Sequence, residues 1–356
     1  MKKHNFGAGP GILPQEALKQ SAEAVMNLNN IGLSLLEISH RSKDFTEIID
    51  SAKAHVRELL GVPDSHSILF LQGGASLQFT MVPMNLLPEK GTAGYVQTGA
   101  WAKKAAKEAA MIGETTVLAS SEDKNYTYIP KGYDIPSSLS YLHLTSNNTI
   151  YGTQLKEYPY DSVPLVCDMS SDIFSKKVDV SKFDLIYAGA QKNMGPAGTT
   201  MVIVKNEALE RSGRAIPTML NYKTHVDKDS LFNTPPVFAI YVCLKTLEWL
   251  KGQGGVDAID AMNTKKAELL YNEIDNNPMF RGTAETEDRS SMNVCFLMNK
   301  PDLEEEFMNV TKEAGIIGIK GHRSVGGFRA SIYNALPMES VEVLVNVMKE
   351  FALKTA

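Results

Sequence analysis

The segment Tyr187-Ala-Gly-Ala-Gln-Lys-Asn-Met-Gly-Pro-Ala-Gly198 places one lysine, Lys192, among small residues between two strand-like runs. The runs are Phe183–Tyr187 and Thr199–Val204, so the lysine lies on a short loop of a β-sheet. Small neighbours let a flat ligand approach the backbone, and a partly desolvated amine has a lowered pKa. The segment therefore predicts a nucleophilic lysine at a ligand site.

An acidic residue precedes this lysine at the end of another strand. Asp168 follows the apolar run Pro164-Leu-Val-Cys167. Pyridoxal phosphate requires both groups, a lysine for its aldehyde and an acid for its pyridine nitrogen. The pair Asp168 and Lys192 therefore leads to the hypothesis of a pyridoxal phosphate site.

The composition limits the classes of protein to which this chain can belong. The chain has 356 residues, 43% of them hydrophobic, which is enough for two domains with a substantial interior. Its net charge of −5 argues against a general nucleic-acid or membrane-surface binder, because those carry a basic excess. No apolar leader follows Met1-Lys-Lys3 and no stretch approaches the length of a membrane span, so we expect a cytoplasmic protein without a membrane partner.

The three cysteines, Cys167, Cys243 and Cys295, each lie inside an apolar run. Unpaired thiols of this kind are typical small core residues in a reducing compartment. Their spacing does not match a metal site, so we expect no metal.

Helical and strand-like patterns alternate through most of the chain, which predicts an α/β fold with a mostly parallel sheet between helices. A smaller C-terminal α/β domain is expected to follow the glycines Gly252-Gln-Gly-Gly255. The expected division is an N-terminal segment 1–15, a large domain 16–255 and a small domain 256–356. Expected helices include Gln15–Asn27, Phe45–Leu60, Ser76–Leu87, Ala100–Met111, Phe238–Leu250 and Val256–Asn276; expected strands include Ser67–Leu71, Gly94–Gln97, Tyr141–Thr145, Leu165–Cys167 and Phe328–Ser331.

Two glycine-rich stretches are candidate phosphate sites. Gly73-Gly-Ala-Ser76 joins a strand to a helix, where free N–H groups and the helix dipole favour an anion. A plain turn with Ser76 as the helix N-cap is an equally good interpretation. The run Gly7-Ala-Gly-Pro-Gly11 follows no strand, and we interpret it as a turn.

Further polar and aromatic residues fall at the expected ligand edge of the sheet. Trp101 is either a stacking partner for an aromatic cofactor or a core anchor of its helix, and the polar loop Ser146–Thr149 follows another strand. Histidine and arginine occur as the pairs His40-Arg41 and His322-Arg323, with Arg329 close to the second. Grouped guanidinium forks predict a substrate with more than one anionic group.

Together these motifs resemble the phosphoserine aminotransferase family of class V pyridoxal-phosphate enzymes, over nearly the whole chain. The most specific pieces are Ile38-Ser-His-Arg-Ser-Lys43, Phe232-Asn-Thr-Pro-Pro236 and Gly321-His-Arg-Ser-Val-Gly-Gly327. The resemblance implies fold type I, a homodimer with shared active sites, and interconversion of 3-phosphohydroxypyruvate plus glutamate with O-phosphoserine plus 2-oxoglutarate in serine biosynthesis. It leaves open whether 4-phosphohydroxy-L-threonine of pyridoxine biosynthesis is also a substrate.

The resemblance also implies a role for each site residue. Lys192 and Asp168 are the catalytic pair, and Trp101 stacks on the cofactor ring. The remaining cofactor contacts are Ala75, Ser76, Thr149 and Gln191, with Asn233 and Thr234 from the partner subunit; the substrate contacts are His40, Arg41, His322, Arg323 and Arg329. Some relatives carry an arginine where Ser76 stands here.

Three alternatives are weaker. A cysteine desulfurase of the same fold needs a cysteine on a mobile loop, whereas these cysteines lie in apolar runs. A nicotinamide-dependent oxidoreductase needs a Gly-x-Gly-x-x-Gly fingerprint followed by an acid, and the chain lacks a convincing one. A binding module without catalysis gives no reason for Asp168 and Lys192 to coincide with a phosphate site.

Overall fold

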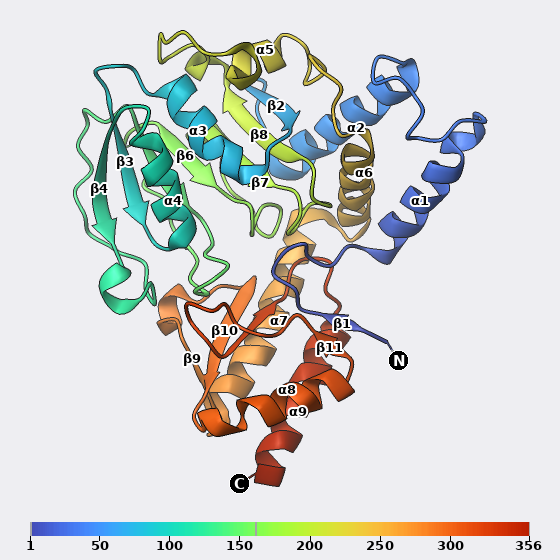
Figure 1. Ribbon diagram of the computed structural model, residues 1–356, viewed down its shortest axis with the longest axis vertical. Helices are drawn as coiled ribbons and strands as arrows, with labels where there is room; N and C mark the ends of the chain where they lie inside the picture. Colours follow the sequence, from blue (N-terminus) through green and yellow to red (C-terminus); the bar gives the residue numbers. More distant parts are fainter. Residues whose placement is uncertain (1, 161, 356) are drawn as a thin grey trace.

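A computed structural model describes residues 2–160 and 162–355. Its central element, in the upper part of Figure 1, is a seven-stranded sheet in the order β2-β8-β7-β6-β5-β3-β4. Strands β4, β3, β5, β6 and β7 run parallel, and β8 is antiparallel to both β7 and β2. The strands are β2 (His66–Leu71), β3 (Thr92–Gln97), β4 (Glu114–Ser120), β5 (Tyr141–Thr145), β6 (Leu165–Asp168), β7 (Leu185–Gly189) and β8 (Thr200–Lys205).

Helices cover both faces of this sheet, because successive side chains of its strands point in opposite directions. Ile186 packs in the core on the side of α2 and α6, whereas its neighbour Tyr187 packs with α3 and α4. Every residue of β5, β6 and β7 is buried, which explains why these strands are mostly apolar and do not alternate with exposed polar residues. The covering helices are α1 (Gln15–Met26), α2 (Lys43–Leu60), α3 (Gly74–Leu86), α4 (Ala100–Ala109) and α6 (Val237–Gly252), and the short α5 is Tyr222–Val226.

A second core forms the lower part of Figure 1, around the antiparallel sheet β12-β10-β9. The N-terminal strand joins this part of the molecule, since His4 of β1 pairs in parallel with Ile316 of β11 and Phe6 lies in the second core. The elements are β1 (His4–Asn5), α7 (Gly255–Asn276), β9 (Phe280–Gly282), β10 (Asn293–Met298), α8 (Glu304–Glu313), β11 (Ile316–Ile317), β12 (Phe328–Ser331) and α9 (Met338–Thr355).

The predicted fold class is confirmed, and most element boundaries differ from expectation by one or two residues. The strand expected at Phe183–Tyr187 occupies Leu185–Gly189, because Phe183 still belongs to the turn after a 3-10 helix. The two-residue strands β1 and β11 and the helix α5 were not predicted, since such short elements carry no periodic signal. The division at residues 15 and 255 stays a prediction.

All three cysteines are buried and unpaired, as predicted. Within residues 2–160 and 162–355, no helix is both long and apolar enough to cross a membrane. The same residues contain no group of three or more His, Cys, Asp or Glu side chains arranged to hold a metal ion.

Candidate active site

Lys192 lies on the loop between β7 and β8, and its side chain enters a cavity of about 460 Å³. Its Nζ donates a hydrogen bond of 2.8 Å to Oγ1 of Thr149. Burial lowers the pKa of Lys192 to about 8; the nearby Asp168 carboxylate opposes this shift and the Arg329 guanidinium adds to it. The neutral, nucleophilic amine is therefore far more populated at neutral pH than for an ordinary lysine.

Asp168 is held rigidly at the end of β6, deep in the same region. Its Oδ1 accepts hydrogen bonds from the backbone N–H of Ser170 at 2.9 Å and from the Ser170 hydroxyl at 2.6 Å. Oγ of Ser170 in turn accepts from the N–H of Gly189 at 3.1 Å, which ties the carboxylate to β7. Burial raises the pKa of Asp168, while the Lys192 ammonium and the bonds from Ser170 act in the opposite direction.

The cavity has an aromatic side, which α4 provides. The Trp101 ring centroid lies 5.6 Å from Nζ of Lys192. Its indole Nε1 is buried, and no hydrogen-bond partner for it occurs among the described residues. The cavity is lined by Ala8, Gly9, Pro10, Gly74, Trp101, Thr149, Ile150, Gln191, Lys192, Ala197, Gly198, Thr199, His322 and Arg329.

The N-terminal glycine run forms one wall of this cavity, a role that our interpretation of it as a turn missed. The N–H of Gly11 donates to the carbonyl of Gln191 at 2.7 Å. A Cβ atom at Gly11 would lie 2.5 Å from the carbonyl oxygen of Lys192, so the contact requires glycine. The succession of small residues was the available signal, since only such residues allow one backbone to approach another this closely.

A cationic side of the cavity comes from the smaller part of the molecule. Arg329 on β12 donates from Nη1 to the carbonyl of Thr149 at 3.2 Å, and its buried Nε has no partner among the described residues. Nδ1 of His322 lies 2.7 Å from Oγ of Ser324. Burial, followed by the charges of Arg329, Arg323 and Lys104, lowers the pKa of His322. Arg323 itself is exposed and lies outside the cavity lining.

The turn before α3 places Gly74 in the cavity wall. Gly73 and Gly74 adopt left-handed backbone conformations with φ of 89° and 68°. Gly73 is the N-cap, so the interpretation of Ser76 as the cap is wrong; Ser76 lies within the first turn of α3 and is exposed. The unpaired N–H groups of this first turn, where Ala75 and Ser76 lie, remain suited to an anion.

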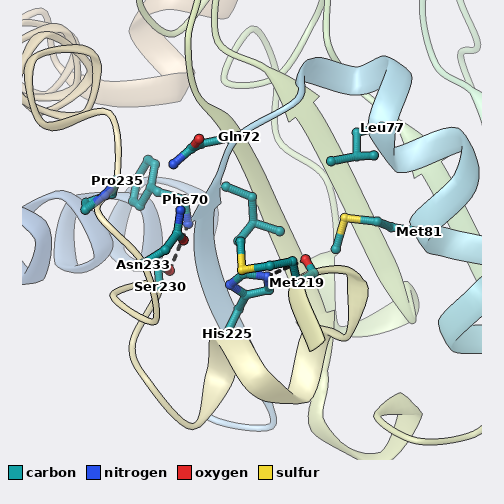
Figure 2. A pocket seen from close by; sticks show the side chains of 10 residues that line it. Phe70, Gln72, Leu77, Met81, Met219, His225, Ser230, Asn233 and Pro235 are labelled. Carbon is teal, nitrogen blue, oxygen red and sulfur yellow. Dashed lines mark hydrogen bonds between the residues drawn. The ribbon is translucent and has the colours of Figure 1, made fainter. Parts of the chain in front are cut away.

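Two further pairs of predicted residues, Asn233–Thr234 and His40–Arg41, lie on segments that do not line the cavity within one chain. Asn233 lines a separate, small cavity beside Gln72 and His225, which Figure 2 shows. The carbonyl of its neighbour Thr234 accepts a hydrogen bond of 2.9 Å from Nε2 of Gln72. The other pair stands just before α2, where His40 is half-buried and Arg41 is exposed.

The sequence profile of Aminotransferase class-V matches residues 4–344. The phosphoserine aminotransferase of Flavobacterium johnsoniae is 59% identical over 355 residues, covering 99% of this chain and 100% of the relative. The chain belongs to the class-V aminotransferases, in their phosphoserine aminotransferase branch. That of Parabacteroides distasonis is also 59% identical, over 99% of both chains.

Solved structures of this branch superpose on nearly the whole chain. The phosphoserine aminotransferase from Bacillus circulans subsp. alkalophilus has a TM-score of 0.97 at 46% identity and covers 100% of this chain and 99% of its own. The phosphoserine aminotransferase with bound pyridoxal phosphate from Trichomonas vaginalis has a TM-score of 0.93 at 36% identity, with coverage of 98% and 100%.

Pyridoxal phosphate is the cofactor of this aminotransferase, and the cavity fits it in four respects. Lys192, with its lowered pKa, and the fixed, buried carboxylate of Asp168 both lie at the carboxyl ends of neighbouring parallel strands. The Trp101 ring lines the cavity 5.6 Å from Nζ of Lys192, and a helix N-terminus with unpaired N–H groups adjoins the cavity at Gly74. These are the groups that an aldehyde, a pyridine nitrogen, an aromatic ring and a phosphate require.

Proposed function

We propose that this chain transfers the amino group of glutamate to 3-phosphohydroxypyruvate, giving O-phospho-L-serine and 2-oxoglutarate, in serine biosynthesis in the cytoplasm. One observation carries the proposal: a single cavity is lined by the reactive Lys192 and also by His322 and the cation Arg329. Such a cavity suits a substrate that has a reacting carbon and separate anionic groups. The high identity to phosphoserine aminotransferases supports the same substrates.

The cofactor would be held by residues from α3 and α4 and from the segments at or after the ends of β5, β6 and β7. Lys192 would hold its aldehyde carbon, Asp168 its ring nitrogen and Trp101 its ring face. Thr149 and Gln191 would bind the ring substituents, and Ala75 and Ser76 at the start of α3 the phosphate. When bound, pyridoxal phosphate supplies an electron sink for the pair of electrons left on the substrate's α carbon.

Lys192 has the right acidity to move the substrate's proton. Because its pKa is about 8, Nζ is able to accept a proton from the α carbon near neutral pH and to return it to the product. Thr149 accepts the hydrogen bond of this amine and so fixes where Nζ lies in the cavity. The ring of Trp101 and the small residues of the N-terminal wall exclude water from the reacting atoms.

The charged groups of the substrate are divided among the cations. Arg329, whose Nη1 is anchored on Thr149, would bind the α-carboxylate together with Arg41. His40, His322 and Arg323 would bind the phosphate. Burial, followed by the neighbouring cations, lowers the pKa of His322, and an incoming phosphate dianion would oppose this shift and favour its protonation.

We further propose that the enzyme is a homodimer in which each active site uses residues from both chains. In one chain Thr234 is exposed and Asn233 lines a different cavity from Lys192. Both lie beside Gln72, directly before the glycine turn that leads to the predicted phosphate site. A partner subunit that brings its own Asn233 and Thr234 to the cofactor phosphate would complete the site.

The visible absorption spectrum tests the cofactor and the substrate together. Protein reconstituted with pyridoxal phosphate should absorb in the visible range, and O-phospho-L-serine should convert this band to the near-ultraviolet absorption of the aminated cofactor. L-Serine, which lacks the phosphate, is the matched control and should leave the band nearly unchanged. A band that L-serine and O-phospho-L-serine convert equally well would refute the assignment of the substrate.

Complementation tests the shared site. Lys192→Ala and Thr234→Asp are each expected to be inactive as homodimers, the second because its carboxylate repels the cofactor phosphate. Mixed dimers would contain one intact site, since the Lys192→Ala chain still supplies Thr234. Random reassortment should then restore about a quarter of wild-type activity. No recovery after verified exchange of subunits would contradict the shared site.

The remaining alternative of the same fold, a cysteine desulfurase, is disfavoured by the cysteines. Burial raises the pKa of Cys295 to about 12 and that of Cys167 and Cys243 as well. A nucleophilic thiolate requires the opposite shift.

A further inference from the structure

A small apolar cluster adjoins the active-site cavity, and its buried residues belong to none of the larger hydrophobic cores. It consists of the buried side chains Tyr126, Ile150 and Tyr151, which we call the tyrosine cluster. The rings of Tyr126 and Tyr151 lie 4.7 Å apart. Trp101 of α4 and Val325 of the loop between β11 and β12 pack against it.

The tyrosine cluster thereby contacts three elements that line the cavity. Trp101 is itself a lining residue, and Ile150 directly follows Thr149, which accepts the hydrogen bond from Lys192. Tyr151 packs closely against the start of α4, since a Cβ atom at Gly99, the N-cap of that helix, would lie 3.3 Å from the Tyr151 ring. The residue that attaches the third element, the loop of His322 and Arg323, is Val325.

The loop of Val325 is a compact unit, so a contact at one residue fixes its neighbours. The N–H groups of Val325 and Gly326 both donate to the carbonyl of His322, at 2.9 and 2.8 Å. The loop is closed at its base by a 2.8 Å bond from Gly321 to Gly327, and Ser324 orients the His322 ring. These bonds lie within the loop. The contact of the loop with the tyrosine cluster comes from the half-buried side chain of Val325.

We propose that Val325 is a positioning residue for the substrate phosphate, because its packing on the tyrosine cluster sets where His322 and Arg323 stand relative to Lys192. The inference rests on the proposed function, in which those two residues bind the phosphate. Val325 does not line the cavity, so it acts through the loop and not by contact with substrate.

Three variants of the holoenzyme test this role. Val325→Ala removes the contact and should raise the KM for O-phospho-L-serine and the inhibition constant of inorganic phosphate about fivefold, with kcat and the KM for glutamate unchanged. Val325→Ile should behave as wild type, since a neighbouring cavity of about 220 Å³ has room for the added methyl group. Val343→Ala, a half-buried valine on α9 in the second core, is the matched control and should change none of these constants.

The outcomes separate this inference from the proposed function. Wild-type constants in Val325→Ala, or equal increases for phosphoserine and glutamate, would overturn the positioning role, as would the same change in Val343→Ala. His322→Ala serves as the reference for phosphate binding itself. If His322→Ala weakens phosphoserine selectively and Val325→Ala does not, the inference fails alone; if wild-type enzyme neither uses phosphoserine nor responds to phosphate, the proposed function fails and the inference with it.

Discussion

Lys192 is half-buried and Lys266 is fully buried, and only Lys192 is placed for chemistry. Burial lowers the pKa of both, to about 8 for Lys192 and about 7 for Lys266. Among the described residues, Lys192 donates a hydrogen bond to one hydroxyl group, that of Thr149, and it faces a cavity. Lys266 on α7 is fully buried, and its Nζ donates to the carbonyls of Ile332, Tyr333 and Leu336 at 3.0, 2.8 and 3.2 Å.

The difference shows that a lowered lysine pKa does not by itself identify a reactive group. Three carbonyl oxygens occupy all three donors of the Lys266 ammonium, so this side chain fastens the segment after β12 to α7. Tyr333 of that segment donates to the carbonyl of Ala8 at 2.7 Å, in the wall of the active site. Lys266 therefore supports the site mechanically, whereas Lys192 has one easily exchanged partner and free space around it.

The largest expected effect is the loss of turnover in Lys192→Ala. The variant should fold with a near-normal thermal midpoint, because the side chain lines a cavity and its hydrogen bond to the Thr149 hydroxyl is a single contact. Its turnover with O-phospho-L-serine and 2-oxoglutarate should fall about ten-thousandfold, since no other group is placed to move the proton of the α carbon. Lys265→Ala, an exposed change on α7, is the control. A turnover within tenfold of wild type would remove Lys192 from the mechanism.

Lys266→Ala should produce the opposite result, a loss of stability with active folded enzyme. Removing a fully buried side chain and leaving three carbonyls without their donor should cost about 3 kcal/mol of unfolding free energy. Denaturant unfolding measures the loss, again against Lys265→Ala. Turnover per folded protein should change far less than in Lys192→Ala. A stable but inactive Lys266→Ala variant would show that Lys266 acts in turnover and not in stability, contrary to this prediction.

Chemical labelling of the cofactor-free protein sharpens the contrast in reactivity. Acetylation of Lys192, followed by mass spectrometry across a pH series, should show a midpoint near its pKa of about 8. Lys266 should remain unlabelled while the protein is folded, although its pKa is the lower of the two. Labelling of Lys266 at pH 8 would show that its surroundings open.

The smallest expected effect is a pH dependence of stability that Lys266 alone causes. Its pKa is lower in the folded than in the unfolded chain, so the unfolded chain binds more protons between about pH 7 and 10.4, and stability rises with pH through that window. The stability of wild type relative to Lys266→Met should therefore increase by about 1 to 2 kcal/mol from pH 7 to pH 9. A difference that does not change with pH would show that the three carbonyls keep the ammonium charged.

Much of this contrast could not be predicted from the sequence. Lys192 was identified because small residues and two strands surround it locally, and Asp168 because it ends an apolar strand. Lys266 gave no such signal, since it lies in a helix among ordinary polar residues and its carbonyl partners come from residues 332–336. Burial of a helix residue by a distant segment is a tertiary property.

The candidate site follows the same division. Strand ends are local patterns, so Trp101 and Thr149 were predicted at the ligand edge, whereas the family resemblance implied Gln191 and Arg329. All four line one cavity. The wall formed by Ala8, Gly9 and Pro10 was missed, because no residue near them in sequence shows that the preceding strand β1 pairs with the distant strand β11. Whether Asn233, Thr234, His40 and Arg41 complete the site depends on a second chain, and their roles stay predictions.

The pairing of β1 with β11 has a consequence for the order of events during synthesis. His4 leaves the ribosome long before its strand partner Ile316 is made. The wall that covers Lys192 therefore closes only after nearly the whole chain has been translated, even though the seven-stranded sheet can assemble earlier. A nascent chain stalled within α8 would already carry Lys192 and Asp168 but leave them open to water, so the finished pocket marks a completed polypeptide.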